Sequence, residues 1–164
     1  MGRRFKDPAI GKDIESLARE SDHRALIAWA VECAERVLPL FEEHSPNDPR
    51  PRRAMEVLRE FGRTGRFSMK VVREASLSAH AAARECPDDG PARFAARAAG
   101  QAVATAHVPT HATGAAYYAA KAIAAVRPLD ADAIIEERKW QYRRLVELID
   151  ELGTDGEKVR LFRR

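Results

Sequence analysis

The stretch that decides the fold is residues 92–126, ARFAARAAGQAVATAHVPTHATGAAYYAAKAIAAV. Alanine predominates in it, and alanine combines the highest helix propensity with almost no side chain. Pro109 interrupts the stretch, and a proline inside a helix removes a backbone hydrogen bond and costs about 3 kcal/mol. We therefore expect two closely packed helices, 92–107 and 110–126; one helix kinked at Pro109 is the alternative.

The rest of the chain shows the same helical pattern. Apolar residues spaced three or four apart predict helices over 8–20, from 22 to about Val37, where Pro39 ends or kinks the helix, and over 52–61, 68–85 and 131–152. No run of β-branched residues alternates with the period of a strand. The sequence therefore predicts an all-α fold: a compact antiparallel bundle of about six or seven helices with the alanine-rich pair at its centre.

Local signals predict where several helices begin and end. Asp7 is expected to cap the first helix with Pro8 in its first turn, and Ser68 to cap the helix that follows it. A glycine within Gly62–Arg66 is expected to end the preceding helix. In the last helix two acids and two bases follow one another over residues 136–139, which predicts an ion-paired exposed surface.

Length and composition are those of a globular protein. The chain suits a single helical domain over residues 1–164, with basic tails at 1–7 and 154–164 that we expect to be flexible. Its 28 basic and 25 acidic residues leave a net charge of +3, and no nucleic-acid-binding motif accompanies the tails, so nucleic acid is not the expected partner. Cys33 and Cys86 are too isolated to form a disulfide framework.

The sequence shows neither a secretory signal nor a membrane span. The basic start lacks an apolar segment, and polar or charged residues interrupt the alanine-rich stretch. We therefore expect a cytoplasmic protein. Alanine-rich helices also pack well between subunits, so a homo-oligomer remains open.

Polar side chains recur on the alanine-rich pair at helical spacing. One stripe consists of Arg93, Arg97 and Gln101, and a second consists of His111, Tyr118 and Lys121. If the stripes face each other across Pro109, they form a cationic pocket for a carboxylate or a phosphate. The alternative is that both stripes are solvated faces of helices whose alanine faces are buried.

His107 and His111 are four residues apart, a spacing that on one continuous helix suits a metal ion. Pro109 lies between them, and a third ligand is evident only if the fold brings in His80 or a cysteine. The alternative is that each histidine is a structural residue with a hydrogen-bond partner. We assign no metal and no cofactor, and we keep His80, His107 and His111 as candidate binding residues.

A second candidate surface is an interface for a protein partner. It consists of the proline-rich loop and the arginines after it, with Trp140 elsewhere: Asp48, Arg50, Arg52, Arg53 and Trp140. Arginine and tryptophan are common among interface residues that contribute most to binding. No serine elbow, Cys–His pair or carboxylate pair typical of catalysis is present, so the sequence assigns no catalytic residue and favours a binding protein over an enzyme.

Four segments resemble one bacterial protein family. They are DHRALIAWAVECAERVLPLFE (22–42), PNDPRPRRAME (46–56), ARFAARAAGQAVATAHVPTHATGAAYYAAKA (92–122) and ERKWQYRRL (137–145). Over roughly residues 20–150 the chain is similar to the immunity proteins likened to the fifth immunity-protein group. The motif positions in the alanine-rich pair are His107, His111, Gly114, Tyr118 and Lys121, and those in the loop are Asp48, Arg50 and Arg52.

This resemblance implies an α-helical cytoplasmic protein that neutralises a cognate toxin by binding it, and it assigns no catalytic residue. From the residues alone, the alternative is a helical binding protein or an enzyme that binds a metal ion or a small anion at the His107–His111 corner.

Overall fold

The computed structural model describes residues 4–152, and these form seven α-helices and no strand. The helices are α1 (Ile10–Arg19), α2 (His23–His44), α3 (Arg50–Thr64), α4 (Met69–Arg84), α5 (Pro91–Ala104), α6 (His111–Val126) and α7 (Ala131–Leu152). The predicted all-α class is confirmed. The predicted C-terminal tail, 154–164, and residues 1–3 of the predicted N-terminal tail lie outside the described residues.

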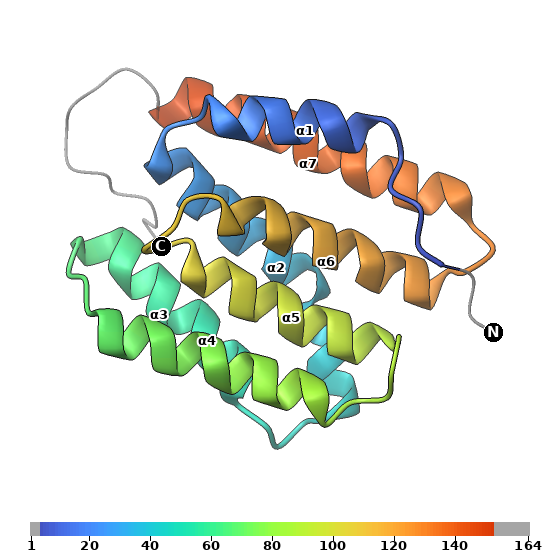
Figure 1. Ribbon diagram of the computed structural model, residues 1–164, viewed down its shortest axis with the longest axis horizontal. Coiled ribbons are helices and arrows are strands. Elements are labelled where there is room, and N and C mark those ends of the chain that lie inside the picture. The colour runs from blue at the N-terminus through green and yellow to red at the C-terminus, as the bar shows by residue number, and fades with distance from the viewer. Residues whose placement is uncertain (1–3, 153–164) are drawn as a thin grey trace.

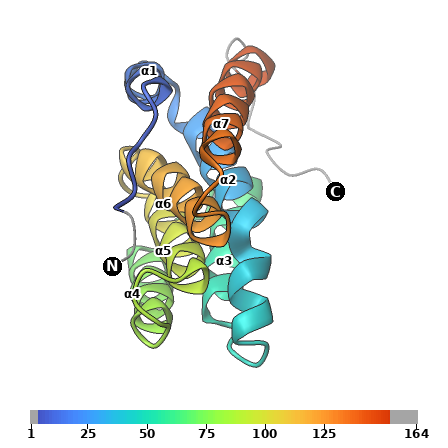
Figure 2. The same ribbon diagram turned by 90° about the vertical axis from the view of Figure 1, so that its right-hand side faces the viewer.

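The helices pack in two layers. Helices α4, α5 and α6 lie side by side in one layer and α3, α2 and α7 in the other, while α1 packs against both α6 and α7 (Figures 1 and 2). Helix α5 contacts α2, α3, α4 and α6, so the alanine-rich pair is central, as predicted. Consecutive helices from α4 to α7 alternate in direction (Figure 1). One broad face of α4–α6 therefore remains uncovered by another helix.

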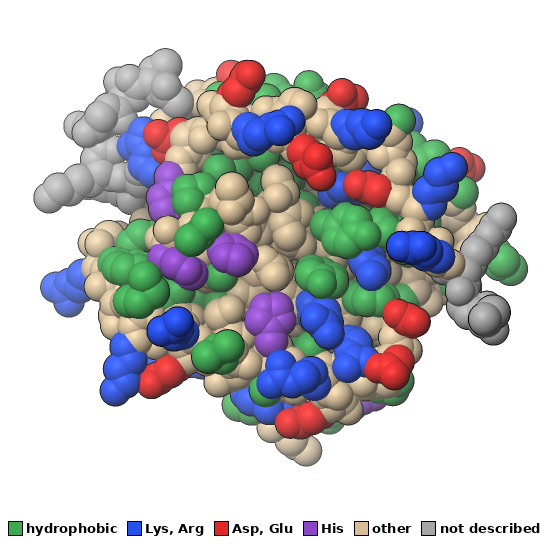
Figure 3. Space-filling model, in the orientation of Figure 1, with side chains coloured by type: hydrophobic (Ala, Val, Ile, Leu, Met, Phe, Trp, Pro, Cys, Tyr) green, Lys and Arg blue, Asp and Glu red, His purple; other side chains and the backbone are tan. Residues whose placement is uncertain are grey.

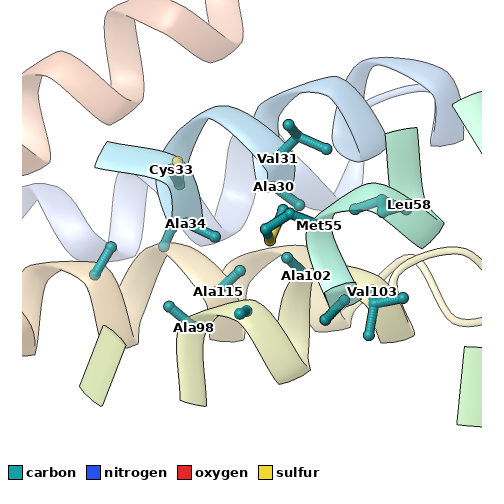
Figure 4. Close-up of a cluster of buried hydrophobic side chains, with 14 of the residues drawn as sticks. Ala30, Val31, Cys33, Ala34, Met55, Leu58, Ala98, Ala102, Val103 and Ala115 are labelled. Carbon is teal, nitrogen blue, oxygen red and sulfur yellow. The ribbon is translucent and has the colours of Figure 1, made fainter. Parts of the chain in front are cut away.

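Alanine explains how α2, α5 and α6 approach one another. Buried alanines from these helices meet the larger Met55 and Leu58 of α3 in the core (Figure 4). Small side chains let helix backbones come close, and the larger ones fill the remaining space at native packing density. The alanine-rich stretch forms two helices, as predicted, with α5 ending at Ala104 and α6 beginning at His111.

Most of the predicted helix ends are found in the structure. The Asp22 carboxylate accepts a hydrogen bond from the Arg24 backbone N–H (2.8 Å), and Ser68 Oγ accepts one from that of Val71 (3.3 Å). Gly65 ends α3 with a φ of 68°, a left-handed conformation that glycine adopts without steric cost.

The prediction for Asp7 is wrong. Residue Ala9 precedes α1 without a side-chain cap, and the Asp7 carboxylate instead accepts hydrogen bonds from Arg138 Nε (2.9 Å) and Nη2 (2.6 Å). The guanidinium of Arg138 is buried, and it attracts the carboxylate more strongly than two backbone amides at a helix end would. The Phe5 ring also packs edge-on against Tyr117, with ring centroids 5.3 Å apart.

Pro39 does not end α2, which continues to His44. Pro39 is exposed, so the backbone carbonyl that loses its hydrogen-bond donor faces the side of the helix open to water. The apolar side of α2, including Val37, Leu38 and Phe41, is buried on both sides of the proline. Packing of that side stabilises the helix beyond the point where local propensity predicts an end.

The predicted ion-paired surface of α7 is half wrong. Glu136 and Lys139 are exposed and pair with each other (3.0 Å), but Glu137 and Arg138 are buried at 5% and 2% exposure. Gln141, one turn later, is fully buried; it donates to the Ala116 carbonyl (3.0 Å) and accepts from Arg138 (2.8 Å). Helix α7 thus places a buried polar cluster between the layers.

None of the helices in the described part of the chain is long and apolar enough to cross a membrane.

Candidate functional site

The corner between α5 and α6 positions the predicted histidines. After Ala104 the chain turns through residues 105–110, and the His111 backbone N–H donates to the Val108 carbonyl (3.1 Å). His107 lies in this turn and is exposed, whereas His111 opens α6 and is half-buried. Their ring centroids are 5.7 Å apart at 40°. The two rings are therefore neighbours across a corner, and not along one helix face.

His111 is held by Gln101 of α5. Its Nδ1 donates to Gln101 Oε1 (2.8 Å). The amide of Gln101 occupies the space beside Gly114, where an added Cβ would lie 2.7 Å from Oε1. Burial lowers the pKa of His111, and the nearby His107 lowers it further. This hydrogen bond joins the two stripes that the sequence predicts on α5 and α6.

His80 of α4 lies against α5. Its imidazole covers Gly100, where an added Cβ would lie 2.7 Å from Nε2, and the Ser76 hydroxyl one turn earlier donates to the Gly100 carbonyl (3.0 Å). Burial lowers the pKa of His80, and the charges of Arg97 and Arg84 lower it further. Both effects favour the neutral form of His80.

A further histidine contacts this corner from the other layer of helices. His23, at the start of α2, donates from Nε2 to the Thr105 carbonyl (2.6 Å). Histidine side chains accordingly gather on the face seen in Figure 3. Within residues 4–152 no three His, Cys, Asp or Glu side chains are grouped so that they could hold a metal ion.

A row of cations and aromatic rings continues from this corner along α5 and α6. The Lys121 ammonium lies 4.5 Å from the Phe94 ring centroid and 5.8 Å from that of Tyr118. The Arg97 guanidinium lies 5.8 Å from the same Tyr118 ring, and Phe94 and Tyr118 are stacked. Distances of up to about 6 Å allow cation–π attraction. Arg97, Tyr118 and Lys121 are thus brought together, all half-buried.

Arg93, the first residue of the predicted α5 stripe, differs from Arg97. It forms an ion pair with Asp88 in the loop before α5. In contrast, neither Arg97 nor Lys121 has a carboxylate within 4.0 Å among the described residues. The two cations next to Tyr118 therefore keep their charge available at the surface.

The predicted loop interface contains arginines that are already bound within the protein. Arg50 donates to Asp48 (2.6 Å) and to Glu85 at the end of α4 (2.7 Å), and these hydrogen bonds raise its pKa. The same pairing lowers the pKa of Asp48. Arg50 therefore ties the loop before α3 to the end of α4.

The remaining arginines of this loop interface are more exposed. Arg52 pairs with Glu42 of α2 (2.7 Å), and Arg53 lies 3.6 Å from Glu56 on its own helix, with 67% of its side chain exposed. Exposed pairs of this kind contribute little to stability. Arg53 is thus the member of the group that is most open to a partner.

Trp140 packs within the molecule. The Arg36 guanidinium lies 3.8 Å from its ring centroid and also binds Glu137 (2.8 Å). Trp140 belongs to the layer of α2 and α7, so it is separated from the α5–α6 corner.

Sequence reasoning missed Phe94, Tyr117 and Arg84 as parts of the α4–α6 face. Phe94 is three residues before Arg97, and Arg84 is four residues after His80, so the helical spacing already placed each on the same side as a predicted residue. Both cysteines are buried, and burial raises the pKa of Cys33 and of Cys86.

Comparison with known proteins adds one finding. A family model matches residues 16–148, which contain the last turn of α1, all of α2–α6 and most of α7. No curated protein and no solved structure matches the chain. The matched model describes Imm-5 like putative immunity proteins, and because it covers most of the chain, the protein belongs to that family.

Proposed function

We propose that this protein neutralises a cognate protein toxin by binding it. Family membership across residues 16–148 is the observation that carries this proposal. An immunity protein acts by occupying a surface of its toxin, and a helical scaffold suits this role because its surface changes little on binding. The uncovered α4–α6 face offers tyrosine and arginine side chains, which are common in protein interfaces.

The function can be tested in two steps. The tagged protein is first used to capture partners from a lysate of its own host, and a stoichiometric partner is identified by mass spectrometry. The gene for that partner is then expressed in a susceptible strain with and without this protein. We expect the partner alone to stop growth and co-expression to restore it.

Two results would contradict the proposal. One is a captured partner that has no effect on growth, and the other is a toxic partner whose effect persists at full expression of this protein.

A further inference from the structure

Only some of the cations in the described part of the chain are bound by carboxylates. Several arginines of α3 and α7 are bound in this way, as in the pairs Arg52–Glu42, Arg63–Glu60 and Arg144–Glu32. On the α4–α6 face Arg93 is bound by Asp88, but other cations are not bound. Arg84, Arg97 and Lys121, which we call the basic row, have no carboxylate within 4.0 Å in the described part of the chain. Figure 3 shows Lys and Arg side chains gathered beside the histidines on this face.

The three cations come from three adjacent helices. Arg84 ends α4, Arg97 lies on α5 and Lys121 on α6. His80 lies between the first two, because it is one turn before Arg84 on α4 and its imidazole covers Gly100, one turn after Arg97 on α5. Tyr118 connects the other two, with Arg97 and Lys121 each 5.8 Å from its ring. The basic row therefore crosses all three helices.

The surroundings of the row limit the motion of its side chains. Lys121 is half-buried over the rings of Phe94, Tyr117 and Tyr118, and Arg97 is half-buried beside Tyr118. A free lysine or arginine loses much rotamer entropy when it binds a partner. Here cation–π contacts already order two of the three cations, so less entropy is lost on binding.

We propose that the α4–α6 face is the partner-binding surface and that the partner presents a cluster of carboxylates to the basic row. The identification of that partner as a toxin rests on the proposed function; the charge complementarity rests on the row itself. Three cations set among aromatic rings are enough to bind a few carboxylates on a protein surface. Nucleic-acid binding relies on many more contacts to phosphates, so the row favours a protein partner.

The charge complementarity can be tested without the partner by NMR titration of the full-length protein with hexaglutamate. Saturable shifts are expected for backbone amides around His80, Arg97 and Lys121. In the Arg97→Gln, Lys121→Gln variant the affinity should fall at least tenfold. The matched control, Arg53→Gln with Arg63→Gln, removes two cations from α3 that pair with carboxylates, and it should bind as the wild type does. Thermal melts check that both variants fold.

Three results would overturn the inference. They are an absence of saturable shifts at the row, equal affinity in the row variant and the wild type, and a short DNA duplex that binds the same face more tightly than the peptide. The two proposals also fail separately. A toxin that is neutralised equally by the row variant contradicts this surface alone, and peptide binding at the row without any captured toxin contradicts only the proposed function.

Discussion

At the residue scale, Gly100 and Gly114 each leave room for a polar side chain from a neighbouring helix. The imidazole of His80 covers Gly100, and the amide of Gln101 covers Gly114. The sequence suggests that these glycines permit close contact between backbones. In the structure the two side chains occupy this space. The helical spacing of the sequence could not predict this, because spacing does not determine side-chain rotamers.

Gly100→Ala tests this arrangement through its coupling to His80. The added Cβ would lie 2.7 Å from the imidazole, so the ring must move in the single variant. In the His80→Ala background the methyl group meets no ring, and the higher helix propensity of alanine should stabilise the protein by about 1 kcal/mol. Urea unfolding of the wild type, the two single variants and the double variant should show a more favourable change in the free energy of unfolding when Gly100→Ala is made without His80. Equal effects in both backgrounds would contradict the arrangement.

His80 and His111 should make stability depend on pH. Burial lowers the pKa of each below the ordinary value of 6.5, so each stays neutral in the folded protein while its counterpart in the unfolded chain begins to take up a proton. The unfolded state therefore binds more protons, and stability falls as the pH decreases from about 6.5 towards the lowered pKa values.

This pH dependence can be measured as the urea midpoint between about pH 7.5 and pH 5. The wild type should lose stability over this window, and a His80→Gln, His111→Gln variant should lose less. An identical pH dependence in the two proteins would show that neither histidine is responsible.

At the scale of elements, α7 holds the layers together through buried polar groups. Arg138 binds Asp7 before α1 and Gln141 on its own helix, while Gln141 reaches the Ala116 carbonyl of α6. Glu137 extends the cluster to Arg36 of α2 (2.8 Å). These contacts link α7 to three other parts of the chain.

Arg138→Met should therefore destabilise the protein by about 3 kcal/mol, because removal of one partner leaves buried polar groups without hydrogen bonds. Arg53→Met, at an exposed ion pair, should change stability by less than about 0.5 kcal/mol. Urea unfolding compares the two variants. A loss at Arg138 no larger than that at Arg53 would mean that the cluster contributes little.

Local sequence signals predicted most of the elements. Apolar spacing and Pro109 were enough to locate the helices and to divide α5 from α6, because burial of one side and loss of a backbone hydrogen bond act locally. The predicted cap at Asp7 and a helix end at Pro39 are not found, because contacts from distant parts of the chain outweigh the local preference. Packing along α2 carries the helix past Pro39, and Arg138, 131 residues away, takes the Asp7 carboxylate.

The candidate site was also predictable in part from local spacing. The spacing of Arg97, Gln101, His111 and Lys121 on two successive helices predicts stripes, and the Gln101–His111 hydrogen bond joins them. The internal pairing of Arg50 with Glu85 could not be predicted, because it depends on how the start of α3 meets the end of α4. The burial of Glu137 and Arg138 likewise depends on how α7 packs against α2 and α6.

At the scale of the whole molecule, the two-layer packing leaves the basic row at the surface. Long-range attraction between the row and an acidic partner should raise the association rate, and salt should screen it. With a captured toxin, stopped-flow association should slow by about tenfold between low and high salt for the wild type. The row variant, Arg97→Gln with Lys121→Gln, should be slower at low salt and less sensitive to salt. Equal salt dependence in the two proteins would contradict electrostatic steering by the row.

The measurement that tests the central claim most directly is calorimetric titration of the captured toxin with three proteins: the wild type, the row variant and the Arg53→Gln, Arg63→Gln control. We predict a stoichiometric complex with the wild type and the control, and a Kd at least tenfold higher for the row variant. Unchanged affinity in the row variant together with weakened binding in the control would place the toxin on α3, and would contradict the account.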